Sequence, residues 1–121
     1  MANIKESLAA CMKIDGAIGA ALVDMKSGMC LGSTGGGDIL NMEVAAAGNT
    51  DVVRAKMNVM SSLGLKDKIE DMLITLGKQY HLVRMLETQG NLFIYLALHR
   101  DKANLGMARL KLSGIESDLE T

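Results

Sequence analysis

Apolar residues along the chain follow two different spacings, one typical of helices and one typical of strands. In three segments they recur every three or four residues, and in five shorter segments they alternate or run continuously. The helical spacing predicts helices over 3–12, 39–63 and 101–119, and the other spacing predicts strands over 16–25, 29–33, 69–77, 79–87 and 91–99. The expected order of elements is therefore α-ββ-α-βββ-α.

The connections between the predicted strands are short enough to make neighbouring strands antiparallel. The first pair is joined by DMKSG, in which Gly28 suits a tight turn, and the later strands are joined by GK and TQGN. The run NLFIYLALH at 91–99 is apolar on both faces, which is typical of a central strand covered on both sides. We therefore expect an α+β fold, a five-stranded antiparallel sheet with helices on both faces, in a single domain over residues 1–121.

The middle helix is long for a chain of this size. At 1.5 Å per residue, 39–63 would span ~37 Å. Asp38 is the expected N-cap, and Gly64 is well placed to end the helix as the residue after its C-cap.

Composition limits the classes of partner. The net charge of −1 provides no electrostatic footprint for nucleic acid, and the three aromatic residues are too few for a base-stacking platform. The ten methionines fill the core, and part of the excess is expected on an adaptable partner-facing surface. Cys11 and Cys30 form no CxxC pair and are interpreted as reduced thiols. The N-terminus has neither a signal peptide nor a membrane span, so we expect a cytoplasmic protein without membrane contact.

The stretch LGSTGGGDILN at 31–41 raises the question of a phosphate-binding loop. A Walker-type loop needs Lys and Ser or Thr directly after its last glycine, but Asp38 stands there and would repel a phosphate. The dinucleotide fingerprint GxGxxG is also missing. The segment is interpreted as a flexible turn from sheet to helix, and no cofactor is expected.

No catalytic group or metal site is expected either. His81 lies among apolar strand residues and suits a hydrogen-bonded packing role, whereas His99 ends a strand and is expected to be exposed. Ser33 has no nucleophile-elbow context. Glu70 and Asp71 are adjacent on a strand, so they point to opposite faces and cannot act as an acid–base pair.

The order of elements and the strings that fill it resemble the roadblock (dynein light-chain) family over about residues 3–117. The strings are GAIGAALVDMKSGMCLGS, DILNMEVAAAGNTDVVRAKMNVMSSLG, IEDMLITLGKQYHLVRML and NLFIYLALHRDKANLGMARLKL. The chain looks like a bare bacterial or archaeal single-domain member of that family.

The resemblance implies a homodimer in which the third strands of two chains pair into a ten-stranded sheet, with the long helices side by side. The small residues VAAAG at 44–48 and the apolar stripe that follows them favour the same arrangement. An alternative is that this helix only covers its own sheet. The expected dimer interface comprises Met42, Ala45, Ala46, Asn49, Val53, Met57, Met60, Met72 and Ile74.

The resemblance also implies an adaptor or regulator of a small Ras-like GTPase that is not itself an enzyme. The expected partner-binding residues, on the outward face of the long helix, are Asp51, Arg54, Lys56 and Asn58. No catalytic role is transferred to any arginine. Two alternatives remain open: a pure scaffold in a multiprotein complex, and a small-ligand sensor like profilin or PAS domains, although few aromatic or buried polar groups are available to hold a ligand.

Overall fold

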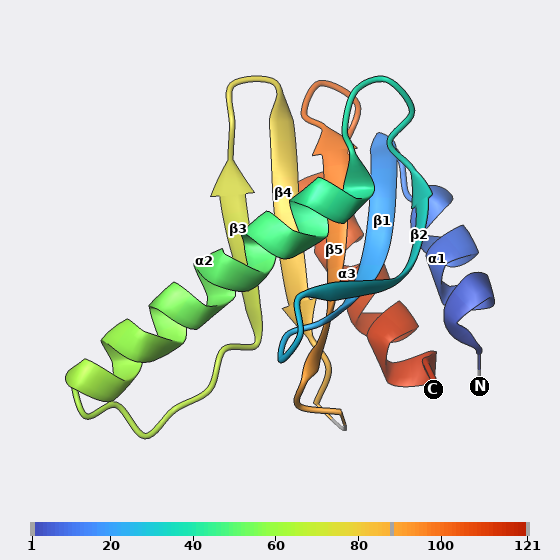
Figure 1. Ribbon diagram of the computed structural model, residues 1–121. Helices are drawn as coiled ribbons and strands as arrows, with labels where there is room; N and C mark the ends of the chain where they lie inside the picture. Colours follow the sequence, from blue (N-terminus) through green and yellow to red (C-terminus); the bar gives the residue numbers. More distant parts are fainter. Residues whose placement is uncertain (1, 88, 121) are drawn as a thin grey trace.

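Five antiparallel strands form one sheet in the order β2-β1-β5-β4-β3 in the computed structural model, which describes residues 2–87 and 89–120 (Figure 1). The order of elements along the chain is the expected α-ββ-α-βββ-α. The elements are α1 (Ile4–Met12), β1 (Ala17–Asp24), β2 (Met29–Gly35), α2 (Met42–Ser62), β3 (Asp71–Thr75), β4 (Gln79–Met85), β5 (Leu92–His99) and α3 (Leu105–Asp118).

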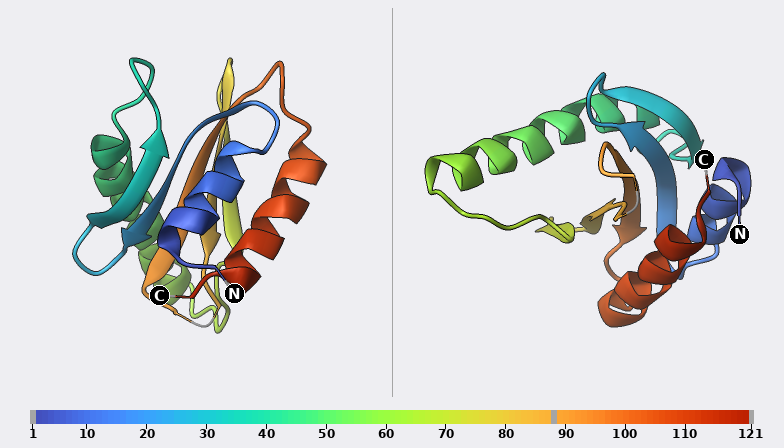
Figure 2. Two further views of the ribbon diagram at one scale, coloured as in Figure 1. Left: turned by 90° about the vertical axis from the view of Figure 1, so that its right-hand side faces the viewer. Right: turned by 90° about the horizontal axis from the view of Figure 1, so that it is seen from below.

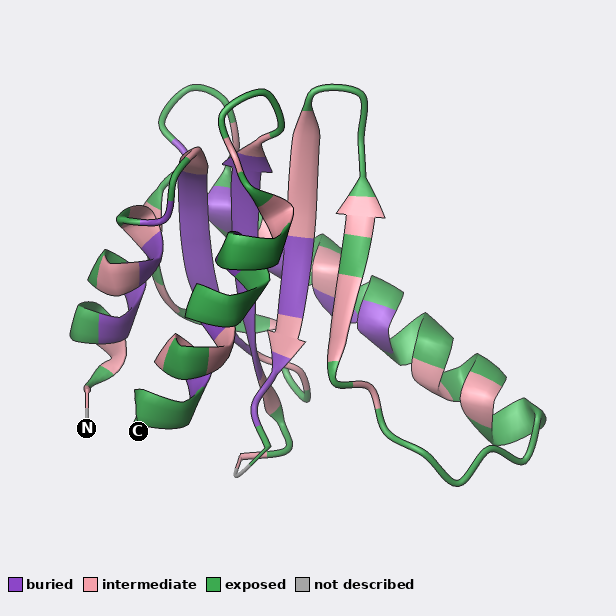
Figure 3. Ribbon diagram, turned by 180° about the vertical axis from the view of Figure 1, so that it is seen from behind, coloured by how far each residue is buried: buried purple, intermediate pink, exposed green. Residues whose placement is uncertain are grey.

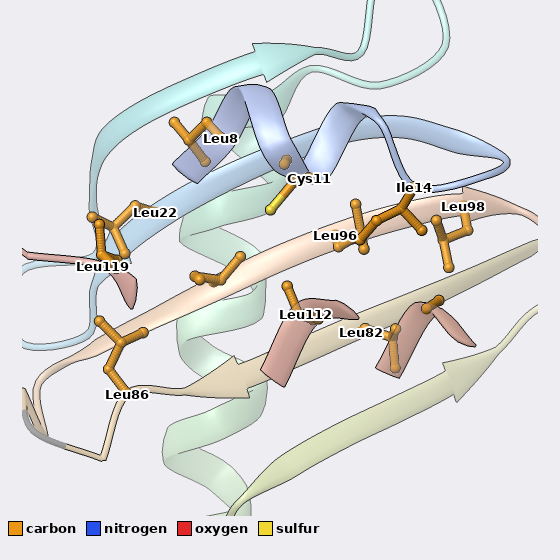
Figure 4. Close-up of a cluster of buried hydrophobic side chains, with 13 residues drawn as sticks. Leu8, Cys11, Ile14, Leu22, Leu82, Leu86, Leu96, Leu98, Leu112 and Leu119 are labelled. Atoms are coloured by element: carbon orange, nitrogen blue, oxygen red, sulfur yellow. The ribbon is translucent and has the colours of Figure 1, made fainter. Parts of the chain in front are cut away.

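Helices cover both faces of this sheet. Helices α1 and α3 lie side by side on one face, and α2 crosses the other (Figure 2). On the α1/α3 face a leucine-rich cluster joins the sheet to the two helices through residues such as Leu8, Leu96 and Leu112 (Figure 4). On the α2 face a second cluster contains Ala46, Val53, Val83, Phe93 and Tyr95. The α+β fold expected from the sequence is confirmed.

The central position of β5 follows from its composition. Phe93 to Leu98 are all almost completely buried, because alternate side chains enter the two clusters on opposite faces. Strand β4 divides its side chains in the same way, with Leu82 on the α3 side and Val83 on the α2 side, as its sequence predicts.

The start of α2 differs from the sequence-based expectation. Asp38 is not the N-cap: the helix begins at Met42, and the side chain of Asn41 accepts hydrogen bonds from the backbone N–H groups of Glu43 and Val44, both at 3.1 Å. Residues 36–40 instead form a compact turn. A Cβ at Gly36, whose φ is +84°, would lie 2.4 Å from the Leu40 carbonyl oxygen, so this turn requires glycine.

The end of α2 agrees with the expectation from the sequence, and the exposure of His99 does not. Gly64 follows the C-cap Leu63 with a φ of +69°, as expected for the residue after the end of α2. His99 is half-buried rather than exposed, because β5 continues to this residue and pairs it with Gln79 on β4.

Helix α2 is longer than the sheet face that it covers. Its first half packs on β2 and β1, and its last turns extend past β3, beyond the edge of the sheet (Figures 1 and 2). Seen from behind, the exposed end of α2 projects clear of β3 (Figure 3). This projection, together with the edge strand β3, forms the candidate site.

Candidate interaction surface

An apolar cleft lies beneath the projecting half of α2. Its volume is about 390 Å³, and it opens between the last turns of α2, the segment that follows them, the end of β4 and the connection that follows β4. Six apolar side chains contribute to its walls, among them Met57, Met60, Ile69 and Met85. The remaining lining residues are Ser61, Leu65, Asp67, Lys68, Glu70, Arg84, Leu86, Glu87 and Gly90.

A second hollow of about 690 Å³ continues from this cleft to the edge strand. Met60 and Ile69 line both spaces, and Lys56, Met72 and Leu73 join them in the second. Met72 pairs with Val83 and Ile74 pairs with His81, so both project on the α2 face of β3. In the described part of the sheet β3 pairs only with β4, so its outer edge is available for another strand.

Seven of the nine residues expected at a dimer interface fall into two groups. Met57, Met60, Met72 and Ile74 are half-buried on the open side of the molecule, around or beside the cleft. Met42, Ala46 and Val53 are buried in their own subunit, at 6%, 0% and 0% exposure, within the cluster between α2 and the sheet. The prediction that these three meet a second copy is therefore corrected: their side chains pack on their own sheet. Ala45 is half-buried beside the same cluster.

Asn49, the remaining residue of that set, belongs to a polar network beneath α2. Its Nδ2 donates to the Ala45 carbonyl at 2.8 Å, and its side chain also hydrogen-bonds Tyr95. The Tyr95 hydroxyl lies 3.1 Å from His81 Nδ1, and His81 Nε2 lies 2.7 Å from Gln79 Oε1. Burial raises the pKa of Tyr95 to about 12, with the Asn49 hydrogen bond opposing it, and burial lowers the pKa of His81. The expected packing role of His81 is confirmed.

The four expected partner-binding residues do not share one face of α2, although all are exposed. Asp51 and Asn58, seven residues apart, point outward. Arg54 lies on one flank, where its Nη2 donates to the Met25 carbonyl at 2.6 Å and also to the Lys26 carbonyl in the β1–β2 turn. Lys56 lies on the other flank and lines the second hollow. The expectation that Arg54 and Lys56 lie on the outward face is therefore wrong, and their role in partner binding stays a prediction.

The outward face of α2 is less polar than the sequence analysis expected. Val44 is 67% exposed and Val59 is 48% exposed, and helical spacing places them on the same side as Ala55, Asp51 and Asn58. These valines were not among the expected partner-binding residues, because the apolar residues of α2 were assigned to inward stripes. The signal was present in the sequence, since Val44 and Val59 do not follow the spacing of the buried positions.

An ion-pair network on the opposite face fixes the start of β3. Arg109 donates to both carboxylate oxygens of Asp71, with distances from 2.8 to 3.1 Å. Arg84 Nη1 lies 3.7 Å from Asp71 Oδ2, and Arg84 Nε lies 3.3 Å from Oε1 of the buried Glu116. Arg84 Nη2 also donates to the Ser113 hydroxyl. Because the pairs are partly buried and share partners, they connect α3 and β4 to the edge strand more firmly than isolated surface pairs would.

The remaining candidate chemistry is sparse in residues 2–87 and 89–120. No group of three or more His, Cys, Asp and Glu side chains is placed to hold a metal ion. Cys11 and Cys30 are free thiols, and burial raises the pKa of Cys11 to about 12. The described residues that line the hollow beside the glycine-rich turn include two acids, Asp38 and Glu43, and no Lys or Arg. Within the same residues, none of the helices has the length and apolar character needed to cross a membrane.

Comparison with solved structures supports the fold. Neither a family model nor a curated protein matches the sequence. Among solved structures, the chain is similar to Myxococcus xanthus MglB, with 17% identity, a TM-score of 0.78 and coverage of 92% of this chain and 82% of that one. A roadblock/LC7 domain from Streptomyces avermitilis gives 9% identity, a TM-score of 0.80 and coverage of 96% and 93%. An MglB with a tetrameric arrangement gives 17% identity, a TM-score of 0.77 and coverage of 93% of this chain and 81% of that one.

Proposed function

We propose that this chain, whose fold is that of the roadblock/LC7 domain, forms a homodimer that binds and regulates a small Ras-like GTPase. The observation that supports the proposal most strongly is that α2 extends beyond the sheet it covers and leaves the apolar cleft and β3 open on the same side. The roadblock fold supports the class of partner, since the family's proteins are adaptors and regulators of such GTPases. The protein itself is proposed to catalyse no reaction.

A second copy of the chain fits the open side. Antiparallel pairing of β3 with the same strand of the partner gives a two-fold axis and a continuous ten-stranded sheet. The projecting half of each α2 then lies over the sheet of the other copy. Met57, Met60 and Met72, half-buried in one subunit, would lose their remaining exposure to water, which stabilises association by about 25 cal/mol per Å² of apolar surface.

The outward face of α2 is the proposed GTPase-binding surface. Val44 and Val59 supply exposed apolar contacts, and Asp51 and Asn58 supply polar ones. The switch regions of small GTPases become ordered or disordered with nucleotide state. A surface that holds a switch in its hydrolysis-ready arrangement accelerates hydrolysis by positioning, with no catalytic group donated. Preferential binding to the GTP-loaded partner follows from this mechanism.

Sedimentation equilibrium tests the dimer. At ~10 µM, where weak association is still visible, the expected mass is twice the 12.9 kDa of one chain. A mass of one chain at that concentration would remove the dimer from the proposal.

Binding to a GTPase is tested with a small Ras-like GTPase from the same organism, loaded with GDP or with a non-hydrolysable GTP analogue. Val59→Glu should weaken binding to the GTP-analogue form by at least about tenfold, because it places a charge in an apolar contact. The control is Lys66→Glu, an exposed position beyond the end of α2. Equal affinity for both nucleotide forms would leave a scaffold without a regulatory mechanism, and an unaffected Val59→Glu variant would place the contact elsewhere.

A small-ligand sensor is the second candidate function, favoured by the size of the apolar cleft. About 390 Å³ lies within the range of ligand pockets, and both apolar and charged residues line the cleft. Native mass spectrometry of the purified protein distinguishes the two candidates. A stoichiometric small molecule retained by the wild type and lost in Met57→Trp would favour sensing, whereas a ligand-free dimer supports the regulator.

A further inference from the structure

The α1/α3 face of β3 is open, unlike the rest of that side of the sheet. Asp71, Leu73 and Thr75 project to this side because they pair with Arg84, Leu82 and Tyr80 of β4. Leu82 is buried below α3, yet Leu73 keeps 38% of its surface exposed. The view from behind shows α3 beside β4 and β5, and β3 without a helix above it (Figure 3).

Helix α3 presents an unusual outer surface next to this open strand. Leu110 is 67% exposed, and Gly106 and Gly114 stand one turn before and after it. The adjacent Arg109 reaches Asp71 on β3, so this turn of α3 borders the open strand. The two glycines lack side chains, and in the described part of the molecule nothing but the nearby Asn104 side chain, next to Gly106, would lie within 4 Å of a Cβ at either position. A second helix can therefore approach α3 closely on both sides of Leu110.

Arginines stand at both ends of this exposed apolar surface. Arg109 lies at the Asp71 end of β3. At the Thr75 end, Arg100 is held by a hydrogen bond to the Leu76 carbonyl at 3.0 Å and lies 5.5 Å from the centre of the Tyr80 ring. Asp71 and Glu116 already pair with arginines. At the other end, Asp101 and Lys78 lie beside Arg100 in one hollow, so four cations stand against three carboxylates. The local surplus of charge is positive.

We propose that this surface, the Leu73–Leu110 strip, docks an acidic amphipathic helix of another protein. Leu73 and Leu110 would receive its apolar stripe, and Arg100 and Arg109 would receive its carboxylates. The two ends of the strip, at Asp71 and Thr75, are four strand residues apart, or ~13 Å. Acidic residues two turns apart on a helix are separated by ~11 Å and match that distance. The strip lies on the opposite face from α2 and does not depend on GTPase binding.

Two designed peptides test the chemistry of the occupant. Both are fluorescein-labelled helices of roughly 20 residues with the same leucine stripe. One has glutamate at its polar positions and the other has lysine. Fluorescence anisotropy should show at least about tenfold tighter binding of the glutamate peptide, and this preference should shrink when the salt concentration rises from about 0.05 to 0.5 M. Equal affinity for the two peptides, or binding of neither, would overturn the proposal.

A matched pair of variants tests the place of binding. Leu110 and Val44 are both 67% exposed, so Leu110→Glu and Val44→Glu should fold equally well. Leu110→Glu should weaken binding of the glutamate peptide by at least about tenfold, and Val44→Glu should leave that binding unchanged. NMR shifts of the wild type on binding should centre on Leu73, Gly106 and Leu110. Equal effects of the two variants, or shifts centred on α2, would contradict the assignment.

Two further measurements distinguish the other possible occupants. Vesicles containing phosphatidylglycerol test a membrane as the occupant. If the wild type binds these vesicles, Leu110→Glu does not, and neither peptide is preferred, the strip binds a lipid surface and not a protein helix. Sedimentation of Leu110→Glu tests a second copy. A mass lower than that of the wild type would assign the strip to self-association, and an unchanged mass with a lost peptide preference supports the proposal.

Discussion

The two halves of α2 have similar apolar spacing but very different surroundings. In the first half, Ala46, Thr50 and Val53 retain at most 1% of their surface exposed, because β1, β2 and β5 lie beneath them. In the second half, Met57 and Met60 continue the same stripe but are only half-buried. The first half therefore stabilises the subunit, and the second has an apolar stripe without a complete sheet below it. A helix longer than its own sheet indicates a surface that another molecule covers.

The largest expected effect concerns the first half of α2, which packs on its own sheet. Ala46→Arg forces a long charged side chain into the closed cluster between α2 and the sheet, where no partner can neutralise it. The free energy of unfolding should fall by about 4 kcal/mol or more, measured by urea denaturation. Ala47→Arg, one residue later on an exposed position, is the control and should change stability by less than ~0.5 kcal/mol. Comparable stability of the two variants would contradict the packing described for α2.

The second effect concerns the second half of α2. A substitution there should weaken the dimer and leave the subunit folded. Met60→Asp places a charge in the apolar cleft, so the dissociation constant of the dimer should rise at least about 30-fold, or ~2 kcal/mol. Analytical ultracentrifugation measures that constant, and circular dichroism checks the fold. Asn58→Asp on the outward face of the same half should leave the dimer unchanged. A dimer that resists Met60→Asp would separate the cleft from self-association.

Arg54 stands at the boundary between the two halves and allows a finer comparison. Arg54→Ala removes the hydrogen bonds that tie α2 to the β1–β2 turn, and should cost about 1 kcal/mol of folding stability. Lys56→Ala, exposed on the other flank, should cost less than ~0.5 kcal/mol. Thermal denaturation compares the two variants. Equal costs would mean that the contact to the turn contributes little.

The smallest effect comes from the polar network beneath the first half. Burial holds the pKa of His81 below its ordinary value of 6.5, so the unfolded chain binds this proton more readily than the folded one. The contribution of His81 therefore lowers folding stability as the pH falls from about 7 to 5. In His81→Gln the stability curve should be flatter over that interval than in the wild type. Parallel curves would show that His81 does not titrate with folding.

The sequence predicts the fold well because strand and helix patterns reflect burial within one chain. The apolar run of β5, the division of β4 into two faces and the end of α2 at Gly64 all follow from local residues. The predicted start of α2 was wrong because Asp38 and Asn41 are both good N-cap residues, and only the tight turn at Gly36 selects Asn41. Local sequence does not contain that tertiary constraint.

The candidate site was less predictable, since apolar periodicity does not say where a supporting sheet ends. Met42, Ala46 and Met60 look alike as members of one stripe, and only the tertiary structure places the first two over the closed core and the third over the open cleft. The rotation of α2 about its axis could have been predicted, since Val44 and Val59 do not follow the spacing of its buried positions. It separates Arg54 and Lys56 onto opposite flanks and exposes Val44 and Val59 between them.

Hydrogen exchange at the two edges of the sheet tests most directly whether a second copy covers β3. Peptides from 71–76 and from 29–34 report on β3 and on β2, the opposite edge, in the same sample. Between about 1 and 100 µM protein, pairing of β3 in a dimer predicts that amides of β3 become progressively protected while those of β2 exchange at a constant rate. Exchange from β3 that does not depend on protein concentration, or equal protection of both edges, would contradict it.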